Sequence, residues 1–194
     1  MHAELEHATQ ALRRGEVVAV ATDTVYGLVC DPRNPAAVRQ VFELKGRGYD
    51  KPLQVLAATV EQAHALIGLP ASAKRLTKLW PGALTIVGQA KVQFAPGVGA
   101  EMRGRTTLGV RVPSSPTVLK LLLAFGPLAA TSANHSGRPE ALRAADVRRT
   151  FRTGLAGILG NDREVMVRVG STVVDVTGAA PKMLRQGAVR LRHA

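Results

Sequence analysis

Residues 17–57 of the chain read VVAVATDTVYGLVCDPRNPAAVRQVFELKGRGYDKPLQVLA, and apolar runs alternate in them with polar turns. Val17–Ala21 is short, apolar and rich in β-branched residues, which predicts a strand. Asn34 followed by Pro35 predicts a helix that runs to about Leu44, because the amide side chain caps the first turn and proline suits its backbone. Leu53–Ala57 predicts another strand. A strand, a helix and a second strand in one stretch predict an α/β sheet protein.

The rest of the chain continues this alternation. Apolar periodicity predicts helices at Ala3–Arg14, after Thr59, at Ser72–Trp80, after Ser115-Pro116 and at Asp146–Phe151. Further strands are predicted at Leu84–Val87, Leu108–Val112, Leu128–Ala130 and Thr172–Val176, with a closing hairpin of Lys182–Arg185 and Val189–Leu191 around Gln186-Gly187. Since no repeat or linker-like stretch divides the chain, we expect one domain over residues 1–194.

The composition indicates a folded, soluble protein. The hydrophobic fraction of 46% is too high for a disordered chain, and 194 residues can fold without disulfides or a structural metal. The lone Cys30 follows an apolar stretch, so a buried inert thiol is expected and a nucleophile is the alternative. No signal-peptide pattern occurs, and the longest apolar run, Leu121–Ala130, is shorter than the roughly 18 residues of a membrane span. We therefore expect a cytoplasmic protein without membrane association.

The chain carries a net charge of +12, from 26 basic and 14 acidic residues. This excess favours an anionic partner such as a nucleotide or RNA, and solubility alone is the alternative explanation. Only 4% of the residues are aromatic, which argues against a protein that binds single strands by stacking bases on aromatic rings.

Two glycine-containing segments have the chemistry of a small-ligand site. Residues 22–28 (TDTVYGL) present hydroxyl groups and a glycine where a strand ends, a common place for ligands in α/β proteins. Residues 45–53 (KGRGYDKPL) place Lys45, Arg47 and Lys51 on a loop after a helix. Point charges, a guanidinium fork and an approachable backbone suit a triphosphate, although this is not the GxxxxGK[ST] loop. An edge strand entering a turn and a solvated charged loop are the alternatives.

Further polar groups follow or end other strands. Residues 131–137 (TSANHSG) carry small hydroxyl and amide groups that can bind phosphate oxygens or adenine edges, with an Asx-type turn as the alternative. Arg111 ends one strand, Ser171 precedes another, and Arg185 precedes a Gln-Gly turn. Motifs of metal or covalent catalysis are missing: the histidines lack ligand spacing, and no GxSxG elbow occurs. Activation of a substrate through phosphate groups is therefore favoured over covalent catalysis by a side chain.

Taken together, seven segments resemble the YrdC-like family of threonylcarbamoyl-adenylate synthases, in its short, single-domain form. In order they are TDTVYGL, ELKGRGYDKPL, LWPGALT, LGVRVP, LAATSANHSGRP, STVVDVT and MLRQGAVR, and they span about residues 16–190. The resemblance implies an α/β fold with a twisted mixed sheet flanked by helices and a large basic concave cleft. It also implies that L-threonine, bicarbonate and ATP are joined into threonylcarbamoyl-adenylate and pyrophosphate, for N6-threonylcarbamoyladenosine modification of tRNA.

The resemblance implies roles for individual residues. Lys45 and Arg47 match the KxR signature and are the expected catalytic cations, facing the ATP phosphates. The expected threonine-binding residues are Thr24, Arg111, Ala130 and Ser171, with Arg111 on the carboxylate. The expected nucleotide-binding residues are Lys45, Arg47, Lys51, Thr107, Ser132, Asn134 and Arg185. Mg²⁺ is expected on the triphosphate, without metal ligands from protein side chains.

The implied partners are tRNA, at the basic cleft, and proteins that transfer the threonylcarbamoyl group. Two other functions compete with this one. A non-enzymatic RNA-binding or ribosome-assembly factor also explains the charge, although no RNA-binding motif occurs. A carbamoyl-adenylate enzyme of the hydrogenase-maturation type usually carries this domain inside a much longer chain. Pyrophosphate release that depends on threonine separates the three.

Overall fold

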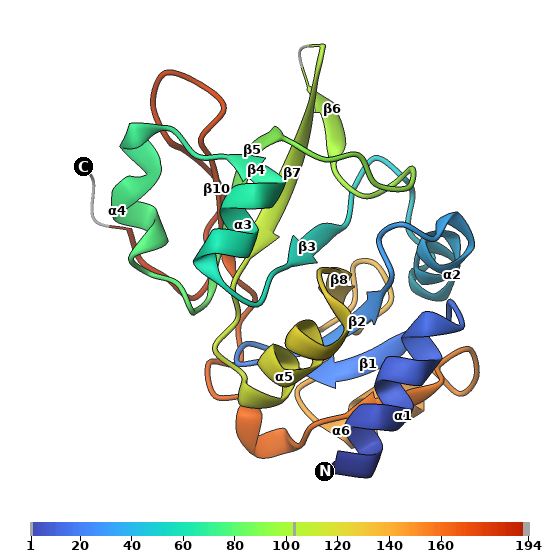
Figure 1. Cartoon of the computed structure of the whole chain (residues 1–194). Coiled ribbons are helices and arrows are strands. Elements are labelled where there is room, and N and C mark those ends of the chain that lie inside the picture. Colours follow the sequence, from blue (N-terminus) through green and yellow to red (C-terminus); the bar gives the residue numbers. More distant parts are fainter. Residues whose placement is uncertain (1, 103, 192–194) are drawn as a thin grey trace.

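The computed structural model describes residues 2–102 and 104–191. In these residues the centre of the molecule is one 11-stranded sheet (Figure 1). Its strands are β1 (Val18–Ala21), β2 (Tyr26–Cys30), β3 (Gln54–Leu56), β4 (Ile67–Gly68), β5 (Leu84–Ala90), β6 (Ala100–Met102), β7 (Arg105–Arg111), β8 (Leu128–Ser132), β9 (Gly157–Leu159), β10 (Thr172–Asp175) and β11 (Lys182–Arg185). The order is β11-β10-β5-β7-β3-β8-β2-β1-β9, with β4 paired to β5 and β6 paired to β7.

The sheet contains parallel and antiparallel neighbours. β1 and β9, β3 and β7, and β5 and β10 run parallel, whereas pairs such as β5 and β7 or β2 and β8 are antiparallel. Parallel partners need a long crossover, so each of these pairs joins distant parts of the chain. The predicted α/β class with a mixed sheet and flanking helices is confirmed.

Helices cover both faces of the sheet around β1. The helices α1 (His2–Arg13) and α5 (Pro116–Phe125) lie side by side over β1, and Leu12 and Leu121 share a core with Val20 (Figure 1). On the other face, α2 (Pro35–Lys45) packs against β2 and adds Val38 and Val41 to the larger core. Burial of one such aliphatic side chain contributes about 1.5–3 kcal/mol. The remaining helices are α3 (Val60–Leu66), α4 (Lys74–Thr77), α6 (Ala144–Thr150) and the 3₁₀ turns η1 (Ala71–Ala73) and η2 (Asp162–Glu164).

The predicted helix starts are confirmed at three places. The Asn34 side chain accepts hydrogen bonds from the first turn of α2, at 3.0 and 3.2 Å. Thr59 caps α3 and Ser115 caps α5, each through its side-chain hydroxyl. These contacts satisfy backbone N–H groups that have no partner inside the helix. The helix α2 ends at Gly46, whose left-handed backbone (φ 56°) suits glycine.

The strand predicted at Lys182–Arg185 is confirmed as β11, but its predicted pairing in a closing hairpin is wrong. β11 pairs with β10, with Val173 opposite Arg185, and residues 189–191 form no strand. Instead, the Thr172 hydroxyl accepts from the backbone N–H of Val189 at 3.1 Å and donates to its carbonyl at 2.8 Å. Gly187 packs against the backbone of residues 170–171, where a Cβ atom would clash. These contacts hold the chain beside β10, so it does not turn back onto β11.

Other element boundaries also differ from the prediction. The helix expected at Ser72–Trp80 is shortened to α4, because the chain tightens into turns there and the Trp80 indole N–H donates to Leu84 O at 2.7 Å. Pro81 disfavours helical backbone at the preceding residue. The predicted strand-to-loop junction at residues 22–28 ends in the strand β2, and the sequence predicts none of the short strands β4, β6 and β9. No helix in the described part of the chain is long and apolar enough to span a bilayer.

Candidate active site

One face of the sheet around β5, β7 and β10 forms the floor of a cavity of about 520 Å³. Side chains alternate along a strand, so Leu84, Ile86 and Val110 face the core while their neighbours face the cavity. The neighbours in and beside these strands that line the cavity are Thr85, Val87, Thr107, Gly109, Arg111, Ser171 and Val173. The volume lies within the range of roughly 300–1,000 Å³ that small-molecule sites occupy.

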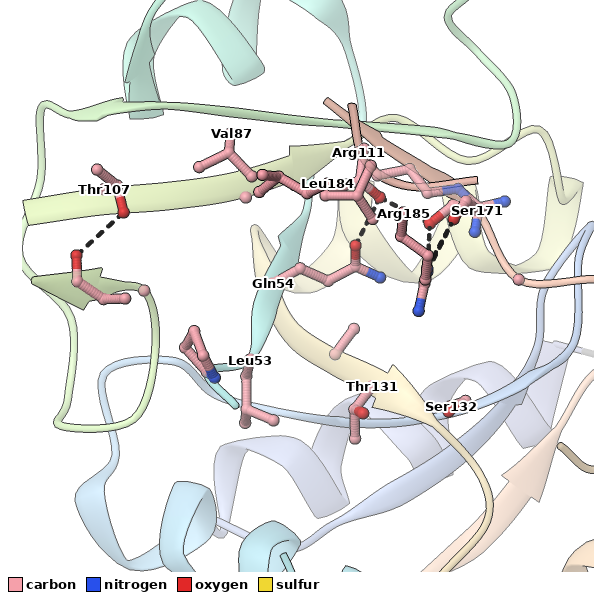
Figure 2. A pocket seen from close by; sticks show the side chains of 18 of the residues that line it. Leu53, Gln54, Val87, Thr107, Arg111, Thr131, Ser132, Ser171, Leu184 and Arg185 are labelled. Carbon is pink, nitrogen blue, oxygen red and sulfur yellow. Dashed lines mark hydrogen bonds between the residues drawn. The ribbon is translucent and has the colours of Figure 1, made fainter. Parts of the chain in front are cut away.

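Most of the predicted site residues meet at this cavity. Figure 2 shows Arg111, Ser171 and Arg185 along one side of it, with Thr131 and Ser132 on the other. The predicted residues that line it are Thr24, Arg47, Thr107, Arg111, Ala130, Ser132, Ser171 and Arg185. Three predicted residues do not: Lys51 is exposed on its loop, and Lys45 and Asn134 are buried beside Ser132. The roles of all these residues stay predictions.

Arg111 lies at the end of β7 and is 3% exposed. Its Nη2 donates to the Asp23 carboxylate at 2.7 Å, its Nη1 donates to the Thr24 hydroxyl at 2.8 Å, and its Nε donates to Gly82 O at 2.9 Å. Burial lowers the pKa of Arg111, and Asp23 opposes that shift. Because a guanidinium has five N–H donors, one on each Nη is left for a ligand.

The turn between β1 and β2 orients Thr24 toward Arg111. The Thr22 hydroxyl accepts from the backbone N–H groups of Thr24 and Val25, at 3.1 and 3.2 Å, and donates to Val25 O at 2.6 Å. This side-chain-to-backbone pattern closes a tight turn. The turn leaves the Thr24 hydroxyl 2.9 Å from that of Thr22 and within reach of the guanidinium.

Arg47 crosses from the loop after α2 to β8. Its Nη1 donates to the Thr131 hydroxyl at 2.9 Å and its Nη2 donates to Pro52 O at 3.1 Å. Its Nε is buried and has no hydrogen-bond partner among the described residues. Burial lowers the pKa of Arg47, and Asp50 opposes that shift. A buried donor without a partner is costly. The second N–H on Nη1 and on Nη2 is left for a ligand in the cavity.

Lys45 closes α2 and is 2% exposed. Its Nζ donates to Ser132 O, Asn134 O and Asn134 Oδ1, at 2.6, 2.8 and 3.3 Å. Burial, followed by the charge of Arg47, lowers the pKa of Lys45 from 10.5 to about 8. The Lys45 side chain thus contacts the end of β8 and the loop that follows it, and it does not line the cavity.

Ser171 and Arg185 form the far wall of the cavity. The Ser171 hydroxyl lies 2.8 Å from that of Thr85, and Arg185 donates through Nε and Nη2 to Ser171 O at 3.1 and 2.8 Å. On β7, the Thr107 hydroxyl donates to Ala100 O at 3.0 Å (Figure 2). The first set of contacts connects β5 and β11 through the residue that precedes β10, and the last connects β7 to β6.

Carboxylates also line the cavity, and the sequence does not predict them as site residues. Asp50, Glu101 and Glu140 stand among the lining residues together with the three arginines, so the predicted basic character of the cleft stays a prediction. Asp23, the partner of Arg111, was also not predicted from the sequence as a site residue. The sequence feature that could have revealed it is an acidic residue between two threonines directly after an apolar strand, because a buried carboxylate needs a cationic partner.

The described residues contain neither a cluster of metal-ligating side chains nor an exposed cysteine. No group of three or more His, Cys, Asp or Glu side chains is placed to hold a metal ion there. Cys30 is fully buried, and burial raises the pKa of its thiol to about 12. The expectation of a buried thiol is confirmed. A thiol protonated at neutral pH is a poor nucleophile.

The chain is similar to proteins of known name. A family model described as Sua5_yciO_yrdC, telomere recombination, matches residues 10–187. A threonylcarbamoyl-AMP synthase of Bacillus subtilis is 38% identical over 190 residues, which are 96% of this chain and 54% of the relative. A threonylcarbamoyl-AMP synthase of Halorhodospira halophila is 40% identical over 174 residues, which are 86% of this chain and 90% of the relative.

Solved structures show the same fold. Pyrococcus abyssi Sua5 complexed with L-threonine has a TM-score of 0.87 and 36% identity, over 96% of this chain and 55% of that chain. Escherichia coli YciO has a TM-score of 0.83 over 96% of this chain and 90% of that chain, and its 22% identity supports the fold alone. The chain thus spans about half the length of the Bacillus relative and of the Pyrococcus structure.

Proposed function

The chain belongs to the Sua5/YciO/YrdC family, and we propose that it is a threonylcarbamoyl-AMP synthase whose described residues form one YrdC-like domain. The proposed reaction joins L-threonine, bicarbonate and ATP into threonylcarbamoyl-adenylate and pyrophosphate. One observation carries the proposal: Arg47, Arg111 and Arg185 converge from distant segments on a single cavity that hydroxyl groups also line. The names of the relatives support the product, and the resemblance of the sequence motifs implies the substrates.

The proposed threonine site is the end of the cavity at Arg111. The guanidinium has an N–H left on each Nη, and these N–H groups would donate to the carboxylate of threonine. Ala130 and Ser171 line the same cavity and would contact the rest of the amino acid. Pyrococcus abyssi Sua5 was solved as a complex with L-threonine, which supports this choice of ligand.

The proposed phosphate site is the part of the cavity between Arg47, Ser132 and Arg185. A triphosphate is strongly anionic, and one unit charge about 4 Å from an opposite charge gains roughly 4 kcal/mol at an effective dielectric constant near 20. Arg47 lines the cavity, and the second N–H on its Nη1 or Nη2 would donate to a phosphate oxygen, as would the Ser132 hydroxyl. Thr107 and Arg185 would hold other parts of the nucleotide.

Magnesium fits this site as a companion of ATP. Mg²⁺ in nucleotide enzymes commonly keeps waters and binds phosphate oxygens plus one or two carboxylates. The cavity offers the isolated carboxylates of Asp50, Glu101 and Glu140 and, within the described residues, no all-protein metal cluster. When bound, the ion would neutralise phosphate charge and polarise the α-phosphate.

The proposed chemistry has two bond-forming steps. The threonine nitrogen, which starts as an ammonium group, bonds to the carbon of bicarbonate. One water molecule leaves and one proton passes to solvent, which gives a carbamate. A carbamate oxygen then bonds to the α-phosphorus while the bond from that phosphorus to pyrophosphate breaks. Arg111 would hold the amino acid, and Arg47 and Arg185 would offset the repulsion between two anions. Holding three small substrates in one cavity supplies a further part of the rate.

Omission of single substrates tests the proposal. The purified chain is incubated with ATP, Mg²⁺, bicarbonate and threonine, and pyrophosphate and the mass of the adenylate are measured. Release should require every component and should stop when EDTA removes the metal. Release with carbamoyl phosphate in place of threonine would identify the hydrogenase-maturation chemistry. No release with either, together with tight RNA binding, would replace the proposal with a binding function.

The adenylate would next be used by partner proteins that transfer the threonylcarbamoyl group to tRNA. We propose tRNA and these transferases as partners because the motif resemblance implies them and because the net charge of +12 favours an anionic partner. A cytoplasmic location belongs to the same proposal. Formation of N6-threonylcarbamoyladenosine in a mixture of this chain, the transferase proteins and unmodified tRNA is the measurement that checks it.

A further inference from the structure

The ammonium group of Lys45 is already bound by protein oxygens and is therefore not free to bind phosphate. We propose that Lys45 is a positioning residue, which holds the loop at residues 132–137 in its binding conformation, and that Arg47 is the residue of the KxR pair that contacts phosphate. This inference rests on the proposed function, because it concerns the ATP site of that reaction. It assigns different tasks to two cations that are neighbours in sequence.

The hydrogen bonds of the ammonium group support this division first. An ammonium group has three N–H donors and no acceptor. The three oxygens within reach of the Lys45 Nζ, at 2.6, 2.8 and 3.3 Å, all belong to Ser132 and Asn134. The side chain is 2% exposed, and it is not among the residues that line the cavity. A contact from Lys45 to phosphate would therefore break at least one bond to the loop.

The backbone around Lys45 holds the same loop. The Ser136 N–H donates to Lys45 O at 2.8 Å, and His135 Nδ1 lies 3.0 Å from Leu44 O. These two carbonyls belong to the last turn of α2, where carbonyl groups lack partners within the helix. The loop is thus attached to the end of α2 through two backbone carbonyls and one buried cation.

Asn134 passes this attachment on to the rest of the loop. Its Nδ2 donates to His135 O at 3.0 Å and to Arg138 O at 2.6 Å, while its Oδ1 accepts from Lys45. Lys45 thereby fixes the orientation of the amide. The Ser132 carbonyl is held toward Lys45, while the Ser132 hydroxyl lines the cavity and has no hydrogen-bond partner in residues 2–102 and 104–191.

Arg47, unlike Lys45, lines the cavity and keeps N–H donors that the described residues do not use. It lines the cavity, two of its donors bind the protein, and its buried Nε has no partner among the described residues. Its guanidinium is also anchored to Thr131, on the strand that leads into the loop. The second N–H on Nη1 and on Nη2 is not used by these contacts and would donate to a phosphate oxygen in the cavity.

Substitutions that separate charge from hydrogen bonding test the proposal. Lys45→Met keeps the stem without donors, and Lys45→Gln keeps two neutral donors without charge. Calorimetry measures the Kd for ATP, and hydrogen exchange of residues 133–137 is followed in the ligand-free protein. Lys45→Met should raise the Kd at least about tenfold and speed exchange. Lys45→Gln, whose amide nitrogen lies one bond nearer the backbone, should fall between Lys45→Met and the wild type in both measurements. Arg47→Met and Arg47→Gln, the matched pair, should both raise the Kd about tenfold without changing exchange.

The opposite pattern overturns the inference. If Lys45→Gln binds ATP as poorly as Lys45→Met and exchange stays unchanged in both, then Lys45 acts by its charge on the phosphates. If Lys45→Met does not fold, Lys45→Gln decides: a loss above about tenfold with unchanged exchange rejects the positioning role. A wild-type chain that binds ATP but makes no adenylate would refute the proposed function and leave these comparisons valid. A chain without ATP affinity would refute both that function and the assignment of Arg47. The exchange data would still show whether Lys45 holds the loop in place.

Discussion

Replacing Arg111 by methionine should damage stability and threonine binding through different contacts. The change keeps an unbranched apolar stem and removes the guanidinium. The Asp23 carboxylate is 1% exposed and would keep only the Ser114 N–H, 3.2 Å away, as a partner. Thr24 and Gly82 would also lose a donor each.

The magnitude follows from the burial of this ion pair. Removing one partner of a buried pair costs about 3–5 kcal/mol, because the other charge stays in the interior without compensation. For a domain of this size about 1 kcal/mol shifts the melting temperature by roughly 2–4 °C, so a drop of about 6–20 °C is expected. Threonine should bind at least about 30-fold more weakly, which corresponds to ~2 kcal/mol, while ATP affinity should change by less than about threefold.

Thermal melting and calorimetry with each ligand measure the two effects. The double variant Asp23→Asn with Arg111→Met removes both charges, so it should regain part of the melting temperature without regaining threonine affinity. A single variant that melts within about 2 °C of the wild type would refute the buried pair as a source of stability. Equal losses of affinity for threonine and ATP would refute the assignment of the carboxylate to Arg111.

Three further outcomes are expected. Iodoacetamide should leave Cys30 unlabelled in the folded protein, because burial raises the pKa of its thiol to about 12; mass spectrometry checks this, and rapid labelling would contradict it. Glu164→Gln should lower the free energy of unfolding by about 1–3 kcal/mol in urea, since this carboxylate accepts hydrogen bonds at the first turn of α5; an unchanged value would mean that these bonds add nothing net. The hydrogen bond from the Tyr26 hydroxyl lowers the pKa of Asp162. The stability that this bond adds to the fold is therefore present at neutral pH and is lost as the pH falls below about 4. Melting temperatures of wild type and Tyr26→Phe should therefore converge in acid, and a constant difference would argue against this linkage.

Local signals in the sequence predicted the helices well. Asn34, Thr59 and Ser115 each stand directly before a helix in the structure, because a cap needs only one side chain and the backbone of the next turn. Turn residues and apolar runs likewise placed most of the longer strands. The predicted helix at Ser72–Trp80 was too long, since a short segment can give up helical bonds for a contact such as that of the Trp80 indole.

The candidate site was partly predictable for the same reason. The polar segments that end strands could be found one at a time, and the resemblance to a family put them together. Thr24, Arg47, Ser132 and Arg185 do line one cavity. Their individual roles stay predictions, as does the basic character of the cleft.

The sequence alone therefore determined the α/β class, the starts of α2, α3 and α5 and the segments that carry the polar side chains, because each depends on neighbours in the chain. Only the tertiary structure decided which of these side chains face the cavity. Asp23 and Arg111 are 88 residues apart, and Lys45 lies 87 residues from the Ser132 carbonyl that it contacts. The pairing of β11 with β10 and the docking of residues 187–189 are decided in the same way. Such contacts form where folding brings distant segments together in a water-poor interior, and there a charge or a backbone carbonyl must find a partner wherever it lies in the sequence.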